Sequence, residues 1–133
     1  MVYYLHSLLS WLSGLVGNQT PTTSTGTFEI YRDSADNFRF RLKAPNSQII
    51  LASESYTTKA SAKKGVASVK KHAPHKRYYR IKTASNGEPM FNLKAANHEI
   101  IGTSETYSSM VTCQHSMDSV KCYAPNASVV DVA

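Results

Sequence analysis

"FRLKAPNSQIILASESYTT" at residues 40–58 returns as "FNLKAANHEIIGTSETYSS" at residues 91–109, an offset of 51 positions. When the alignment is extended to residues 28–74 and 79–125, it matches 17 of 47 positions without a gap. A long sequence that occurs twice in register is typical of one supersecondary unit that needs a neighbour to bury its apolar face. A chain of 133 residues has room for one ordinary domain,. The sequence therefore predicts two copies of one unit within a single domain.

Each copy carries the pattern of three strands and a helix. Residues 38–44 alternate between apolar and basic side chains, as in a strand with one buried face,. The segments at 28–33 and 48–53 read as two further strands. After them apolar residues recur at helical spacing, which predicts helices near 58–72 and 109–123. These residues are Ala62, Val66, Val69 and Ala73 in the first copy and Cys113, Met117, Val120 and Ala124 in the second. Pro74 and Pro125 stop the helices at equivalent places,.

A further strand is expected after each helix. In the second copy this strand is "ASVVDVA" at residues 127–133. In the first copy the equivalent residues fall on "KRYYRIK" at 76–82, which also opens the second copy. We therefore predict that one long strand serves both units. The predicted fold class is α+β, with a single antiparallel-rich sheet, two helices on one face and a pseudo-two-fold axis.

The doubled pattern L-K-A-x-N-x-x-I-I-x-x-S-E-x-Y, at residues 42–56 and 93–107, resembles the YegP-like family of small bacterial proteins, also called DUF1508 or UPF0339. The resemblance covers roughly residues 27–133. It implies tandem β3-α-β units that form one sheet with exchanged C-terminal strands. It implies no established activity and no catalytic residues. The expected domains are a first repeat at 27–76 and a second repeat at 77–133.

Residues 1–26 lie outside the resemblance. Leu5, Leu8, Leu12 and their apolar neighbours predict an amphipathic helix at 2–16, and "NQTPTTSTG" reads as a polar linker,. Three hypotheses stay open for the segment: a helix that packs on the domain, a partner or a membrane surface; a signal peptide; or a poorly ordered extension. It lacks a basic region and a typical cleavage site. We expect the protein in the cytoplasm, with export or membrane association through residues 1–17 as the alternative.

No convergent set of catalytic or metal-binding residues stands out, and we expect neither an enzyme nor a cofactor. Glu54 and Glu105 recur at equivalent positions, but we interpret them as shaping the corner between strand and helix,. The histidines do not show the spacing of metal ligands, and His72 and His75 are expected on the solvated surface,. Two cysteines, Cys113 and Cys122, lie too far apart on one predicted helix to form a disulfide.

Positive charge is concentrated in one region. Residues 59–82 hold nine Lys or Arg and no acidic residue, whereas the rest of the chain holds six basic and nine acidic residues. Basic side chains beside exposed aromatic ones can hold phosphates and stack bases, here with Tyr78 and Tyr79 among them. The other interpretation is a solvated helix face. The candidate polyanion-binding residues are Lys59, Lys63, Lys64, Lys70, Lys71, Lys76, Arg77 and Arg80.

Two functions therefore remain as hypotheses. The first is a non-catalytic structural or protein-interaction module with an unknown protein partner. The alternative is weak, sequence-nonspecific binding of nucleic acid or another polyanion through residues 59–82. Contact of residues 2–16 with a membrane surface is also open. Because the second copy supplies the partner of the first, we expect a monomer with an internal pseudo-two-fold axis.

Overall fold

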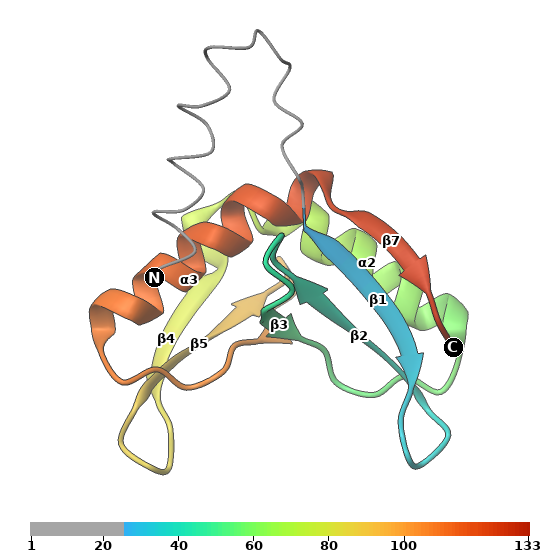
Figure 1. The fold of residues 1–133 in the computed structure, drawn as a ribbon, viewed down its shortest axis with the longest axis horizontal. Coiled ribbons are helices and arrows are strands. Elements are labelled where there is room, and N and C mark those ends of the chain that lie inside the picture. The colour runs from blue at the N-terminus through green and yellow to red at the C-terminus, as the bar shows by residue number, and fades with distance from the viewer. Residues whose placement is uncertain (1–25) are drawn as a thin grey trace, which may run out of the picture.

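The computed structural model describes residues 26–133, drawn as the coloured ribbon in Figure 1. The expected helix at 2–16 and all but the last residue of the linker lie outside the described residues. None of the helices in the described part is long and apolar enough to cross a membrane.

Seven strands form one mixed sheet in the order β4-β5-β6-β3-β2-β1-β7. The first half contributes β1 (Thr27–Arg32), β2 (Phe38–Lys43) and β3 (Ile49–Ala52), and the second half β4 (Tyr79–Thr83), β5 (Pro89–Lys94) and β6 (Ile100–Thr103). Neighbouring strands are antiparallel, except that β1 and β7 (Ser128–Asp131) run parallel. The halves join where Ala52 of β3 pairs with Thr103 of β6. The predicted α+β class and single sheet are confirmed.

Two helices of 14 residues, α2 (Lys59–His72) and α3 (Met110–Tyr123), follow the third strand of each half. A hydroxyl caps each N-terminus: Thr58 Oγ1 accepts the Ser61 N–H at 3.1 Å, and Ser109 Oγ accepts the Thr112 N–H at 3.2 Å. Such caps satisfy backbone donors that the first turn leaves unpaired. Short 3₁₀ turns, η1 (Lys76–Tyr78) and η2 (Ala124–Asn126), come after the helices. Both predicted helices are confirmed.

One core lies between the sheet and the two helices. In β2 the apolar residues Phe38, Phe40 and Leu42 are buried, and the basic residues between them are half-buried. The helix residues predicted from their spacing all belong to this core: Ala62, Val66, Val69, Ala73, Cys113, Met117, Val120 and Ala124. Burying one large apolar side chain stabilises a fold by about 1.5–3 kcal/mol. This shared core therefore accounts for the packing of both helices on the apolar side of the sheet.

The packing at the centre of the sheet is asymmetric. Leu51 and Gly102 occupy equivalent positions in the two halves, 51 residues apart. A Cβ atom placed on Gly102 would lie 2.5 Å from Cδ2 of Leu51, closer than van der Waals contact permits. One half thus contributes a full side chain at this point, and the other leaves the room for it.

The segments after the two helices do not behave alike. From η2, β7 passes to β1, where the Ser128 N–H donates to the Gly26 carbonyl at 3.2 Å and the Val132 N–H to the Ile30 carbonyl at 2.9 Å. Residues 76–82 do not form the predicted strand shared by both units. They form η1 and most of β4, and β4 pairs only with β5.

The shared strand is absent for a local reason. After α2 the N–H of His75 bonds to the His72 carbonyl, and the N–H of Tyr78 bonds to the His75 carbonyl. These bonds coil the segment between α2 and β4, so it cannot also extend beside the sheet. Within residues 26–133 no strand lies against the outer side of β4, at the left of Figure 1, whereas β7 covers β1 at the right.

Candidate functional site

Two of the predicted polyanion-binding lysines hold β7 in place. Lys59 Nζ lies 2.9 Å from Asp131 Oδ2, and Lys70 Nζ donates to the Ala127 carbonyl at 2.8 Å. The Lys59 ammonium, together with the N–H of Ala133, holds the pKa of Asp131 below its usual range. A ligand that recruited these lysines would have to replace bonds that attach β7.

The two predicted arginines bond within the junction of η1 and β4. Arg80 Nη1 donates to the carbonyls of Arg77 at 2.7 Å and Tyr79 at 2.9 Å. Arg77 Nη2 donates to the Tyr78 hydroxyl at 3.1 Å. Both side chains remain exposed. The other four candidates are also exposed and make no hydrogen bond or ion pair within residues 26–133: Lys63, Lys64, Lys71 and Lys76.

The aromatic and imidazole side chains in this region are less accessible than the sequence suggests. Tyr79 is buried, its hydroxyl donates to the Ala73 carbonyl at 2.7 Å, and burial raises the pKa of that hydroxyl. Tyr78 is half-buried, with its ring 4.6 Å from the ring of His72. Neither tyrosine therefore offers an open face for base stacking of the kind that single-strand binders use.

His72 is not on the solvated surface, and that prediction is wrong. Only 6% of the residue is exposed. Its Nδ1 lies 2.8 Å from the Ser68 carbonyl, and its Nε2 accepts the N–H of Ala96 at 3.1 Å. This pair of bonds fixes the neutral tautomer with the proton on Nδ1. His72 thus ties the end of α2 to the turn between β5 and β6.

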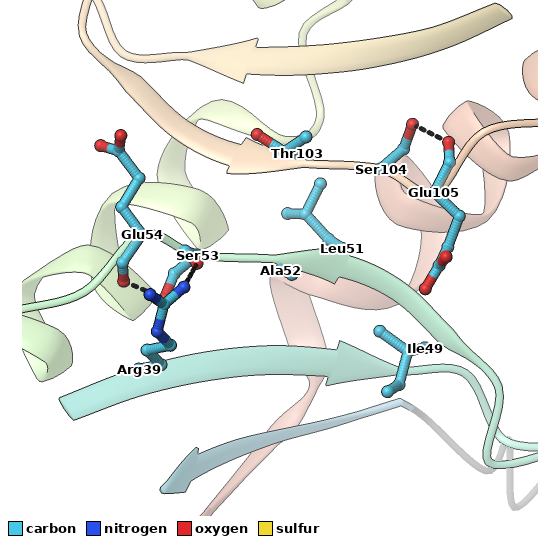
Figure 2. A pocket seen from close by; sticks show the side chains of 9 residues that line it. All are labelled: Arg39, Ile49, Leu51, Ala52, Ser53, Glu54, Thr103, Ser104 and Glu105. Carbon is cyan, nitrogen blue, oxygen red and sulfur yellow. Dashed lines mark hydrogen bonds between the residues drawn. The ribbon is translucent and has the colours of Figure 1, made fainter. Parts of the chain in front are cut away.

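A hollow of about 260 Å³ lies between β3 and β6 and contains the recurring serine–glutamate pairs (Figure 2). Ser53 Oγ accepts the N–H of Phe40 at 2.9 Å and donates to the Glu54 carbonyl at 2.7 Å. Ser104 makes the same two bonds, at the same distances, with Phe91 and Glu105. Both hydroxyls are therefore occupied by the backbone.

The carboxylates of the hollow do not form an acid–base pair. Figure 2 shows Glu54 and Glu105 at opposite ends, with their carboxylates pointing away from each other. Both residues are exposed. Among the described residues there is no group of three or more His, Cys, Asp and Glu side chains that could hold a metal ion. The hollow is lined by Arg39, Ile49, Leu51, Ala52, Ser53, Glu54, Thr103, Ser104 and Glu105.

The outer side of β4 is a different kind of site, which the sequence analysis did not identify. Ile30 of β1 is 0% exposed beneath β7, whereas the equivalent Ile81 of β4 is 41% exposed. At the start of α3, Met110 and Val111 are 46% and 61% exposed. Their equivalents at the start of α2 are Lys59, which bonds to β7, and Ala60. Apolar side chains are therefore exposed where the first half has a covering strand.

Charge also differs between the two edges. On the open face of the first half, Glu29 lies between Arg41 at 2.9 Å and Lys43 at 3.2 Å. The equivalent residues of the second half are Arg80, Asn92 and Lys94, and none of them is acidic. Lys82 follows on the same strand. The β4 edge, which we define as Arg80, Ile81, Lys82, Met110 and Val111, thus combines positive charge with exposed apolar surface. The sequence instead predicted one strand at residues 76–82 shared by both units, which would leave no edge open at β4.

Comparison with known proteins agrees with the fold. The family described as "Domain of unknown function (DUF1508)" matches residues 33–79 and, a second time, residues 84–131. A "UPF0339 protein in ptx operon 5'region" of Stutzerimonas stutzeri is 52% identical over 108 residues, which are 81% of this chain and 97% of that protein. UPF0339 protein YegP of Shigella flexneri is 49% identical over 106 residues, covering 80% of this chain and 96% of the relative.

Two solved structures have the same fold. The solution NMR structure of yegP from E. coli, titled a protein of unknown function, superposes with a TM-score of 0.79 at 46% identity, covering 84% of this chain and 96% of that one. The solution NMR structure of a UPF0339 protein from Shewanella oneidensis superposes with a TM-score of 0.77 at 42% identity, covering 81% and 92%.

Proposed function

The chain belongs to the DUF1508 family, whose matched relatives carry no assigned function, and we propose that it is a non-catalytic module that binds another protein at the β4 edge. One observation carries this proposal. The same sequence position is fully buried in β1 and 41% exposed in β4, because a strand covers only the first of them. An uncovered strand is a ready template for pairing with another chain.

The polar side chains that chemistry would use support a structural role. Ser53 and Ser104 bond to the backbone on both sides, and both ring nitrogens of His72 lie within hydrogen-bond distance of backbone atoms. A nucleophile or a general base needs a free reactive atom near its substrate. In Ser53, Ser104 and His72 these atoms already form hydrogen bonds with the backbone.

The proposed duplication explains why the edge is open. We propose that the chain consists of two copies of one β3-α-β unit, supported by equivalent turns in both halves. Asp36 and Ser47 have positive φ angles of 67° and 71°, and the residues 51 positions later, Gly87 and His98, have φ angles of 85° and 73°. The C-terminal strand of the second copy, β7, pairs with β1 of the first copy. The segment after α2 in the first copy leads through η1 into β4, so within residues 26–133 the first copy has no corresponding strand to pair with β4.

Site-specific cross-linking tests the proposed function. A photoreactive phenylalanine analogue is placed at Ile81, and in a second protein at Val130 of β7, which is similarly exposed but lies on the strand at the opposite edge of the sheet. In lysate from cells that produce the chain, we expect one discrete cross-linked protein with the probe at Ile81 and none with the probe at Val130. Arg80→Glu with Lys82→Glu in the Ile81 probe protein should abolish the product.

Other results would contradict this function. The same products from both probe positions would indicate nonspecific capture, and no product at either position would argue against a protein partner. Retention of RNA or DNA by the purified chain would favour polyanion binding instead, if the triple replacement of Lys63, Lys64 and Lys71 by Glu removed it. Those lysines are exposed, so their replacement should leave the core intact.

A further inference from the structure

We propose that the β4 edge binds an extended acidic segment of a partner protein, which adds to the sheet parallel to β4 as β7 adds to β1. This inference rests on the proposed function and specifies the chemistry of the partner. Main-chain hydrogen bonds supply affinity in such strand addition, and the alternating side chains supply specificity. The position of β7 on β1 supplies the geometry.

The backbone register follows from β7. Phe28, Glu29 and Ile30 lie opposite Val129, Val130 and Asp131. The carbonyls of Gly26 and Ile30 face β7 and accept its N–H groups. The residues equivalent to Phe28 and Ile30 are Tyr79 and Ile81. The Tyr79 N–H already donates to the Lys76 carbonyl and the Tyr79 carbonyl accepts from Arg80, so the added strand would start its pairing at the outward N–H and carbonyl of Ile81,.

On the helix side of the added strand, the site is apolar. Asp131 of β7 lies on this side, since it pairs with Lys59 of α2. The residue of α3 equivalent to Lys59 is Met110, and Met110 and its neighbour Val111 are both exposed. A carboxylate here would lose its ammonium partner and be desolvated against apolar atoms. The residues opposite Tyr79 and Ile81 should therefore be apolar, and β-branched residues suit a strand.

On the open face, the site is cationic. The residues opposite Arg80 and Lys82 would lie beside both of these side chains, with Lys94 on the neighbouring strand. The first half balances its cations with Glu29, whereas the second half has no acidic residue at these positions. A carboxylate from the partner would supply the missing charge, as complementary potentials do at interfaces.

Lys121 of α3 offers a further contact to the added strand. It lies 5.6 Å from the ring of Tyr79, much as its equivalent Lys70 lies 5.9 Å from the ring of Phe28. Lys70 donates to the Ala127 carbonyl just before β7, whereas Lys121 makes only a long ion pair of 3.8 Å with Asp118. Lys121 is thus in position to donate to a carbonyl of the incoming segment.

Charge argues against two other occupants. In an antiparallel pair of β4 strands from two copies, centred on Ile81, Arg80 of one copy would face Lys82 of the other, and like charges opposite each other are destabilising,. Residues 1–25 of this chain contain no acidic residue. The partner segment should therefore read apolar, acidic, apolar, acidic along its length.

The test uses the full chain and a fluorescein-labelled peptide with the core Val-Glu-Ile-Glu between Gly-Ser flanks. Fluorescence anisotropy should show saturable binding that Gln in place of both Glu weakens at least tenfold. Arg80→Glu with Lys82→Glu should also weaken binding at least tenfold. The matched control, Lys63→Glu with Lys64→Glu, makes the same change in net charge on α2 and should change affinity less than twofold.

A second variant blocks the backbone without changing charge. Ile81→Pro removes the outward N–H at an edge position, where proline is tolerated, and should abolish binding. Amide exchange of the free chain supplies a direct check of the edge. The N–H of Ile81 should exchange fast, those of Phe28 and Ile30 slowly, and the peptide should slow the exchange of Ile81.

Several results would overturn the inference. They are no saturable binding, equal loss in the α2 control, or binding that survives Ile81→Pro. Slow exchange of Ile81 in the free chain would show that a second copy or residues 1–25 already fill the edge. If cross-linking at Ile81 captures a protein but the acidic peptide does not bind, the partner chemistry is wrong and the interaction module stands.

Discussion

The strands β1 and β4 come from equivalent positions of two similar sequences, yet their surroundings differ: β1 lies between β2 and β7, whereas β4 is an edge strand. At β1 the adjoining β7 is fastened at both ends, by Lys70 at its start and Lys59 at its finish. At β4 the equivalent of Lys59 is Met110, and within residues 26–133 no strand lies against the outer side of β4. The difference teaches that the residues around a strand position are matched to its occupant. The apolar and cationic residues of the β4 edge therefore indicate the chemistry of a strand that would pair with β4.

The largest expected difference between the halves concerns the thiols of α3. Cys113 and Cys122 are equivalent to Ala62 and Lys71 of α2. Cys113 is buried, and burial raises the pKa of its thiol, whereas Cys122 is exposed. Ellman's reagent should modify Cys122 at least about 1000-fold faster, because Cys113 must wait for an opening of the stable core. Mass spectrometry of samples quenched at intervals measures both rates. Equally fast modification would contradict the equivalence of the two helix faces.

The next largest effect is expected at the asymmetric centre. Gly102→Leu should cost about 3 kcal/mol of unfolding free energy through overpacking. Leu51→Gly should cost about 3–5 kcal/mol through the cavity it leaves. Because the two residues are equivalent and in contact, the double swap should recover at least about 2 kcal/mol of the summed loss. Urea denaturation of the four proteins measures this coupling, and strictly additive losses would show that the halves cannot exchange roles here.

The smallest effect concerns the open-face charges of the first half. The hydrogen bond from Arg41, with the charge of Lys43, lowers the pKa of Glu29 from its ordinary value of 4.5. A carboxylate with a lowered pKa stabilises the fold above its ordinary pKa, and the contribution disappears as the pH falls through the folded value. Glu29→Gln should therefore cost about 0.2–1 kcal/mol at pH 7 and less at pH 3.

Denaturation at both pH values checks this prediction. Glu105→Gln is the control, since this exposed carboxylate makes no ion pair within residues 26–133. An equal cost for Glu29→Gln at both pH values would mean that packing, and not charge, is what the substitution removes.

Local patterns predicted most of the fold. The alternation in residues 38–43 and the helix stripes depend on neighbours within a few positions, and the structure contains both. The roles of the basic residues depended on distant ones. Lys70 bonds to a carbonyl 57 residues away, and His72 accepts an N–H from a residue 24 positions away. No local pattern carries such partners, so polar residues that bond across the fold were taken for solvated surface. The exposure of Ile81 was hidden for the same reason, because it depends on a strand that is missing.

The pairing of β1 with β7 has a consequence for how the protein is made. Thr27 and Ser128 lie side by side although 101 residues separate them in the chain. During synthesis on the ribosome, the first half emerges with Phe28 and Ile30 at an uncovered edge, and the edge stays bare until residues 128–131 have been translated. Closing so long a loop slows folding, and unpaired edges favour aggregation in the interval. The nascent chain therefore exposes β1 as an edge strand until β7 is made, and in the finished sheet of residues 26–133 the edge strands are β4 and β7.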